Sequence, residues 1–128
     1  MRPDRWWRGR SSTTDFGRAA ERQVARWLAD EGLVVVEHNH RNAGGEIDLV
    51  ARDGETLVFV EVKARSRLDY GGALAAIDRD KRRRLVRAAR VYVSSRGWKG
   101  PCRFDVVALQ RIDGEWRYQR YPSAFEAE

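Results

Sequence analysis

The sequence predicts an α/β fold in which a mixed central β-sheet is flanked by α-helices. One segment of helical periodicity precedes three apolar stretches of strand composition, and a second helical segment precedes two more. A chain of 128 residues is of ordinary size for one domain and can bury a sheet beneath helices. We therefore expect a single domain over residues 14–128.

The first 13 residues are rich in Arg, Trp, Ser and Thr and show neither a helical nor an alternating period. We expect residues 1–13 to form a mobile basic arm outside the fold. Its arginines, interleaved with Trp6 and Trp7, could contact nucleic acid by charge and stacking. The alternative is a disordered tail without a binding role.

The first helix is predicted from about Asp15 to Glu31, with Thr14 as its N-cap and Gly32 as its stop. Glu21 lies along the edge of the buried face, so this acid either reaches solvent or faces a polar pocket. The apolar residues at helical spacing are Phe16, Ala20, Val24, Trp27 and Leu28.

Five stretches have the composition of β-strands. They are Leu33 to Glu37, Glu46 to Ala51, Thr56 to Ala64, Arg103 to Leu109 and, more weakly, Trp116 to Tyr121. Between the second and third, Asp53 and Gly54 are typical of a turn. These two strands should therefore form an antiparallel hairpin.

A second helical region is predicted from about Ala73 to Ser94, with Asp78 as a cap for its longer part. Seven basic residues and one acid lie between positions 79 and 90. They form either a solvated face or a surface that follows phosphates, and the nearby hairpin favours the second interpretation. The expected nucleic-acid contacts are Lys81 first, then Arg82, Arg65 and Arg41.

The hairpin places charged residues together. Glu46 and Asp48 share one face of the second strand, and Glu61 and Lys63 share one face of the third. If the loop has an even number of residues, cross-strand pairs join odd to even positions, and Asp48 pairs with Glu61. Two carboxylates and a lysine then lie on one patch of an otherwise apolar sheet, which is rare without a function.

This grouping predicts a metal site. A pair of carboxylates suits Mg²⁺ or Mn²⁺, which take oxygen ligands and keep water for substrate and nucleophile. A neighbouring lysine can orient that water and offset charge on a phosphate undergoing attack. Glu61 and Lys63 are two residues apart, the spacing that puts both on one face of a strand.

With these motifs in place, the sequence resembles the YraN family, which belongs to the PD-(D/E)XK nuclease superfamily, and within it is most similar to archaeal Holliday junction resolvases. The resemblance covers roughly residues 14 to 110. Its main segments are Gly45-Glu46-Ile47-Asp48-Leu49-Val50-Ala51 and Val58-Phe59-Val60-Glu61-Val62-Lys63-Ala64-Arg65. It also includes Gly17 and Glu21, Asn39, Arg41, Gly72, Lys81 and Arg103-Phe104-Asp105-Val106-Val107.

The resemblance implies a restriction-endonuclease-like fold. It also implies that Asp48 and Glu61 are metal ligands, Lys63 the catalytic lysine and Glu21 an outer ligand, with the backbone carbonyl of Val62 as a further donor. The implied activity is metal-dependent cleavage of DNA, with branched DNA and junctions as the expected substrates, in repair, recombination or processing. A homodimer is compatible with such a substrate.

Composition limits the other possibilities. The net charge of +6 favours a polyanionic partner. The single cysteine, Cys102, excludes an intramolecular disulfide and suggests the cytoplasm, and no apolar run is long enough to span a membrane. Two alternatives to a DNA endonuclease stay open. One is an accessory module that binds nucleic acid without cleaving it, and the other is an RNA-directed nuclease.

Several residues invite a simpler explanation. Glu61 and Lys63 could be a salt-bridged pair, and Asp105 is expected to have a structural role beside Arg103 or another strand's arginine. Glu46 is a weaker functional candidate. His38-Asn39-His40 spells the letters of the HNH nucleases, but three adjacent residues at a strand end cannot converge on one ion, so we reject that interpretation.

Overall fold

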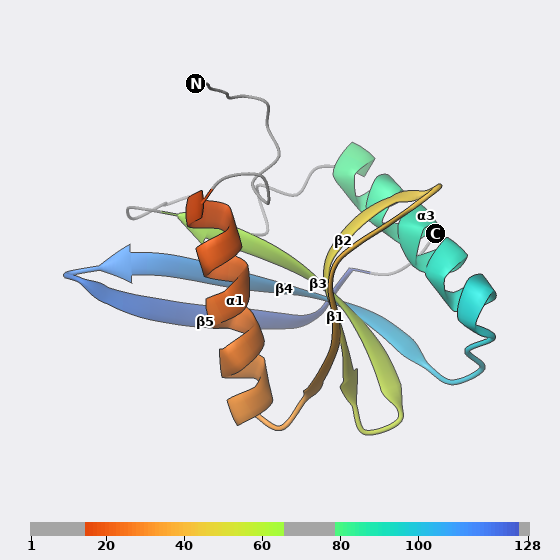
Figure 1. The fold of residues 1–128 in the computed structure, drawn as a ribbon, viewed down its shortest axis with the longest axis horizontal. Coiled ribbons are helices and arrows are strands. Elements are labelled where there is room, and N and C mark those ends of the chain that lie inside the picture. The colour runs from red at the N-terminus through yellow and green to blue at the C-terminus, as the bar shows by residue number, and fades with distance from the viewer. Residues whose placement is uncertain (1–14, 66–78, 126–128) are drawn as a thin grey trace.

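A computed structural model describes residues 15–65 and 79–125 of the protein (Figure 1). The two helices are α1 (Asp15–Asp30) and α3 (Arg79–Arg96). The strands are β1 (Val34–Asn42), β2 (Gly45–Asp53), β3 (Thr56–Arg65), β4 (Cys102–Ile112) and β5 (Glu115–Phe125). The predicted basic arm, the Thr14 and Asp78 caps and the start of the second predicted helix lie outside the described residues.

The strands form one mixed sheet in the order β1-β2-β3-β4-β5. β3 and β4 are parallel, and the other neighbouring pairs are antiparallel. The α/β class and the mixed sheet with flanking helices are thereby confirmed, and the architecture is compatible with a restriction-endonuclease-like fold. The predicted β2–β3 hairpin is also confirmed, because Asp53 pairs with Thr56 across a turn of two residues.

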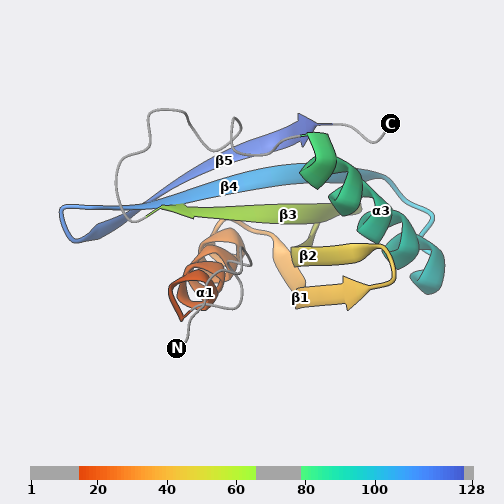
Figure 2. The ribbon, with the colours of Figure 1, turned by 90° about the horizontal axis from the view of Figure 1, so that it is seen from above.

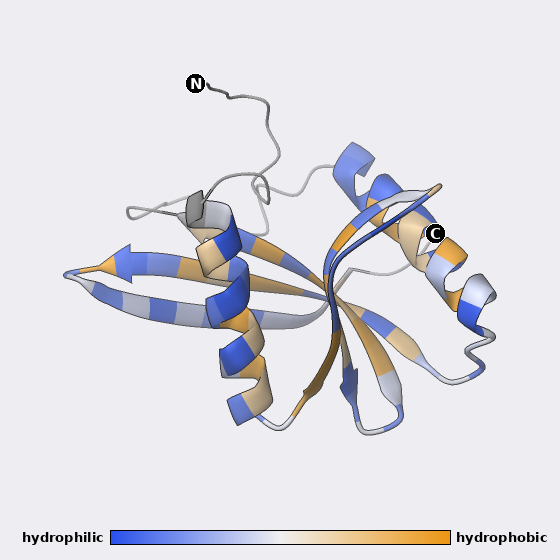
Figure 3. Cartoon of the chain, in the orientation of Figure 1, coloured by the Kyte–Doolittle hydropathy of each residue, from blue (hydrophilic) through white to orange (hydrophobic). Residues whose placement is uncertain are grey.

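The core lies on both faces of the sheet (Figure 2). Ala20, Val24 and Leu28 of α1 pack on one face, where they meet Val58, Val60 and Val107. On the other face, Leu85 and Tyr92 of α3 pack against Phe59 and Phe104. Figure 3 shows the apolar residues concentrated in the central strands, whereas β5 at the edge is mostly hydrophilic. The centre of β3 is consequently covered on both sides.

Strand β1 is longer than the sequence predicted. It continues beyond Glu37 to Asn42 and pairs with β2 through an irregularity between Val35 and Glu37. Hydropathy did not reveal this extension because an edge strand with polar side chains carries no apolar alternation. His38, Asn39 and His40 therefore lie within a strand and not at its end.

The β1–β2 hairpin closes against the backbone of α3. A Cβ on Gly44 would stand 2.7 Å from the carbonyl carbon and oxygen of Arg87, so only glycine allows this approach. The Asn42 amide donates a hydrogen bond to the carbonyl oxygen of Ala88 at 2.9 Å. This contact holds β1 and β2 toward α3. No helix in the part of the chain that the structure describes is long and apolar enough to cross a membrane.

Candidate active site

The strands that carry the predicted acidic residues stop pairing just before they reach them. The β2–β3 register is the predicted one, and its last pair toward this end is Leu49 with Val60. Asp48 and Glu61 are the next residues on their strands, and Glu61 shares the parity of Phe59, which packs against α3. The separation of the strands opens space for both carboxylates within the sheet.

Asp48 fills the gap that the separation leaves in the hydrogen-bond ladder. Its Oδ2 accepts a hydrogen bond from the backbone N–H of Val62 at 2.9 Å. Burial, with the nearby charge of Glu61, raises the pKa of Asp48 well above its ordinary value, although the Val62 N–H opposes that rise. A carboxyl in this environment gains from any cation that neutralises it.

Two lysines neutralise Glu61. The Nζ of Lys81, near the start of α3, lies 2.6 Å from Oε2 of Glu61, and the Nζ of Lys63 lies 3.9 Å from the same oxygen. Both Asp48 and Glu61 are buried. The ion pair of Glu61 with Lys81 thus links β3 to α3 at the centre of the site.

Glu21 reaches the same centre from α1. Its side chain is only 3% exposed, and its Oε1 is buried without a hydrogen-bond partner. Burial raises the pKa of Glu21 to about 7 despite a hydrogen bond from the Asn39 side chain, and the charges of Glu46 and Glu61 act in the same direction as burial. An unsatisfied buried carboxylate oxygen is costly, so it is suited to binding a cation or a proton.

The donor set fits a hard divalent cation in chemistry but is not assembled around one. Asp48, Glu61 and Glu21 supply carboxylate oxygens, one of them unpartnered, and Mg²⁺ and Mn²⁺ prefer such ligands. Among residues 15–65 and 79–125, no three Asp, Glu, His or Cys side chains lie close enough to hold one ion as they stand. Glu61 instead contacts Lys81.

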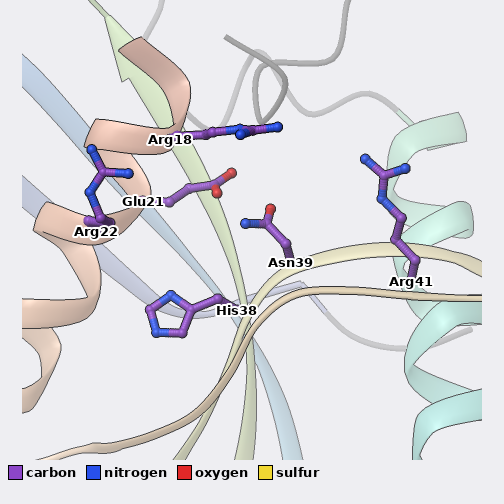
Figure 4. Close-up of a pocket in the computed structure, with 6 residues that line it drawn as sticks. All are labelled: Arg18, Glu21, Arg22, His38, Asn39 and Arg41. Atoms are coloured by element: carbon purple, nitrogen blue, oxygen red, sulfur yellow. The ribbon is translucent and has the colours of Figure 1, made fainter. Parts of the chain in front are cut away.

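A basic pocket of about 310 Å³ opens beside Glu21 (Figure 4). Arg18 and Arg22 of α1 border it together with Arg41 of β1, and Figure 4 shows the guanidinium group of Arg18 above Glu21 and Asn39 and that of Arg41 to their right. Sequence reasoning missed Arg18 and Arg22. A usable signal was that Arg18 lies three residues before Glu21 and four before Arg22, spacings that make helix residues neighbours.

Asn39 was also missed as a site residue. It adopts a φ of 50°, a left-handed conformation that asparagine tolerates better than most residues. Its amide nitrogen is directed toward the Glu21 carboxylate in Figure 4, and it hydrogen-bonds that side chain. The strand backbone thus helps to hold an acid that belongs to a helix.

The predicted nucleic-acid contacts lie in different places. Lys81 points inward to Glu61, whereas Arg82 is exposed on α3. Arg41 is exposed at the basic pocket, with its Nε 3.6 Å from the Glu46 carboxylate. Arg65 ends β3, and its side chain lies outside what the structure describes.

Two other groups have structural roles. Asp105 is fully buried and accepts two hydrogen bonds from Arg103, at 3.0 and 3.2 Å, as the sequence suggested.

The three residues that spell HNH do not converge. His40 contacts Glu37 at 2.8 Å, Asn39 contacts Glu21, and His38 is exposed.

The chain is similar over most of its length to a family of bacterial proteins. Residues 20–109 match the model of the family described as "Uncharacterised protein family UPF0102". A UPF0102 protein of Dechloromonas aromatica (strain RCB) is 52% identical over 105 residues, which are 82% of this chain and 87% of that protein. A UPF0102 protein of Ectopseudomonas mendocina (strain ymp) is 44% identical over 119 residues, 91% of this chain and 99% of that protein.

Proposed function

The chain belongs to the uncharacterised protein family UPF0102, and from that premise and the chemistry of its buried site we propose that it is a metal-dependent DNA endonuclease. This membership confirms the resemblance to the YraN family. We assign cleavage to the centre formed by Asp48, Glu61 and Lys63, with Mg²⁺ or Mn²⁺ as the cofactor.

The observation that carries the proposal is the burial of acids and a lysine where β2 and β3 separate. Asp48 and Glu61 are both buried, and Lys63 lies beside Glu61. A structural ion pair needs one acid and one base, whereas here two acids are buried together, and burial with the charge of Glu61 raises the pKa of Asp48. Such an arrangement is costly for the fold and is typical of functional sites.

Each residue has a distinct task in this account. Asp48 and Glu61 would hold the cation, with the Val62 carbonyl as a further donor, and Glu21 would be an outer ligand. The bound cation supplies Lewis-acid stabilisation of phosphate charge and activation of water. The Nζ of Lys63 orients the attacking water and donates to the phosphate oxygen on which negative charge develops.

The surrounding surface supports a nucleic-acid substrate. Arg18, Arg22 and Arg41 border a pocket next to Glu21, and the outer face of α3 is rich in arginine. Guanidinium groups contact phosphates with paired hydrogen bonds. Since no base-reading motif is visible in the sequence, we expect recognition of backbone and shape, which favours branched DNA or junctions over a defined sequence.

The test is cleavage of end-labelled four-way, flap, nicked, duplex and single-stranded DNA, with RNA versions of the same molecules, in Mg²⁺, Mn²⁺ or EDTA. We expect divalent-ion-dependent cutting of a branched DNA. Lys63→Met should abolish it and leave DNA binding intact. Cutting that persists in EDTA, or that survives in Lys63→Met, contradicts the assignment.

One observation favours a second candidate, a nucleic-acid-binding accessory module. Glu61 is bound to Lys81, and no three potential ligands in the described part of the chain are assembled around one position. A module of this kind binds DNA equally well in EDTA and in Mg²⁺ and cuts none of the substrates. The same assay therefore separates the two candidates.

A further inference from the structure

The contact between Glu61 and Lys81 is shorter than the other contacts described at the acidic centre. The Nζ of Lys81 lies 2.6 Å from Oε2 of Glu61, against 3.9 Å for the Nζ of Lys63. Glu61 is nearly inaccessible, with a side chain 7% exposed, whereas the Lys81 side chain is 35% exposed. The buried acid is thus paired with a base that still reaches solvent.

Lys81 stays charged in this position. Its ammonium lies 2.6 Å from a carboxylate oxygen and its side chain is 35% exposed, and both conditions favour the charged form. Its ammonium therefore supplies positive charge to a centre that also contains Asp48. The lysine therefore balances part of the negative charge of the buried carboxylates, which a divalent cation would otherwise balance.

The lysine and a metal ion would compete for the same atom. A Mg²⁺ ion bound to the oxygen that the Lys81 ammonium contacts at 2.6 Å would lie beside a second cation, and the two would repel each other. The lack of any assembled group of three ligands among the described residues agrees with a site whose central acid is already occupied. Binding of a divalent ion to this oxygen of Glu61 therefore favours the departure of Lys81.

Lys81 has a route out of the site. It is the third residue of α3, its stem has four flexible carbons, and the adjacent Arg82 and Arg83 are exposed. The ammonium can rotate toward solvent without repacking the core, since the buried residues of α3 begin at Leu85. Lys63, whose side chain is 15% exposed and lies within β3, lacks this freedom.

We propose that Lys81 is a built-in cation of the metal-free site, and that a divalent ion binds by displacing its ammonium from Glu61. This inference rests on the proposed function, since it takes Asp48 and Glu61 as the ligands of the ion. The displaced ammonium moves to the mouth of the site beside the exposed arginines of α3, where it contacts a substrate phosphate. Lys81 thereby couples ion binding to phosphate binding.

The displacement sets the apparent affinity for the ion. If the Lys81–Glu61 contact is formed in about nine molecules of ten, the apparent affinity is about tenfold weaker than that of the free carboxylates. Removing the Lys81 ammonium should therefore raise the apparent affinity for the ion about tenfold. Removing the Lys63 ammonium leaves the Lys81–Glu61 contact in place and should not raise the affinity to the same extent.

The first test follows the lysine in the unmodified protein. The chain contains three lysines, Lys63, Lys81 and Lys99, so acetylation of amines followed by mass spectrometry reads each one separately. We expect Mg²⁺ to raise the acetylation rate of Lys81 several-fold relative to EDTA, with the exposed Lys99 as the internal reference. The rise should be absent in Asp48→Asn. An unchanged or slower rate at Lys81 in saturating Mg²⁺ overturns the proposal.

The second test measures Mn²⁺ binding by calorimetry without nucleic acid. Lys81→Met should bind Mn²⁺ about tenfold more tightly than the wild type. Lys63→Met removes the same charge from the same carboxylate and is the matched control. Equal gains in the two variants would show a general charge effect and overturn displacement.

The two tests also separate this proposal from the proposed function. If Asp48→Asn abolishes Mn²⁺ binding and Lys81→Met leaves the affinity unchanged, the metal site is retained and only the displacement of Lys81 is overturned. Absence of Mn²⁺ binding in the wild type and in Lys81→Met overturns both.

Discussion

The Oδ2 atom of Asp48 accepts a hydrogen bond from the backbone N–H of Val62, 2.9 Å away, where β2 and β3 cease to pair. The Asp48 carboxylate therefore accepts the backbone hydrogen bond that a paired strand would otherwise accept. This contact fixes the Asp48 carboxylate next to Glu61 and joins the fold to the chemistry of the site. It also predicts how the site responds to substitution.

Asp48→Asn should leave the fold intact while removing cleavage. The amide oxygen can still accept the Val62 N–H, and the substitution removes a buried charge whose raised pKa marks it as unfavourable. In EDTA at pH 8 we expect a stability equal to or above that of the wild type, measured by urea unfolding. Cleavage should fall by a factor on the order of 10² to 10³.

Asp105→Ala should have the opposite effect to Asp48→Asn, lowering the stability of the fold without changing the metal site. Asp105 is fully buried, accepts two hydrogen bonds from Arg103 and accepts a third from the Ser123 N–H at 3.0 Å. Removing it takes two hydrogen bonds from a guanidinium that keeps its ion pair with Asp53, and it removes the acceptor of the Ser123 N–H, which costs about 1–3 kcal/mol. Urea unfolding should show this loss, and Mn²⁺ affinity should be unchanged in the folded protein. A stable Asp105→Ala protein with weakened Mn²⁺ binding would place Asp105 in the metal site.

Glu21→Gln should change the pH dependence of stability. The pKa of Glu21 is about 7 in the folded protein against an ordinary value of 4.5, so between these values the folded state holds a proton that the unfolded state has lost. The free energy of unfolding therefore falls as pH rises from about 4.5 to 7, by on the order of 3 kcal/mol in full.

The measurement is urea unfolding at pH 5 and pH 8 in EDTA. Glu21→Gln should remove this decrease and be more stable than the wild type at pH 8. Asp48 changes the pH dependence of the free energy of unfolding in the same direction in both proteins. The difference in pH dependence between the two proteins therefore reports the contribution of Glu21. A variant that parallels the wild type across this range would contradict the raised pKa.

Gly44→Ala should destabilise the hairpin that carries Asn39. The added Cβ would lie 2.7 Å from the backbone of Arg87, so β1 and β2 must move away from α3. We expect a loss of about 1–3 kcal/mol by thermal or urea unfolding. Ala43→Gly, at the exposed neighbouring position of the same turn, is the control and should cost less. Equal losses would show that the turn, and not its contact with α3, sets the stability.

Arg18→Ala and Arg41→Ala should weaken DNA binding through phosphate contacts. Both residues border the pocket beside Glu21. Each lost contact should reduce the slope of log affinity against log salt by about 0.9, and the effect should be similar for different sequences. Fluorescence anisotropy in EDTA measures this slope without cleavage. Arg26→Ala, exposed elsewhere on α1, is the control, and an equal change there would remove the pocket from the account.

The sequence was informative where side-chain parity determines geometry. The alternation in β2 and β3, with a turn at Gly54, was sufficient to predict the register that brings Asp48 and Glu61 together. Glu21 could be placed at the edge of the buried face of α1 from helical spacing alone. These relationships are local, or follow from one short hairpin.

Long-range contacts were not predictable in the same way. The contact of Lys81 with Glu61 depends on how α3 crosses the sheet, which no short spacing determines. The length of β1 depends on pairing with β2, and the contact of Asn39 with Glu21 depends on a positive φ within that strand. In each case the partner comes from a distant part of the chain, and the local pattern does not indicate it.

The most direct test of the central claim is cleavage of an end-labelled branched DNA by the wild type and by Asp48→Asn, in Mg²⁺ and in EDTA, at equal folded concentrations. The account predicts cutting only by the wild type and only in Mg²⁺, with both proteins binding the DNA. Equal cutting by the two proteins, or no cutting by either in any divalent ion, would contradict the assignment of Asp48, Glu61 and Lys63 as a nuclease centre.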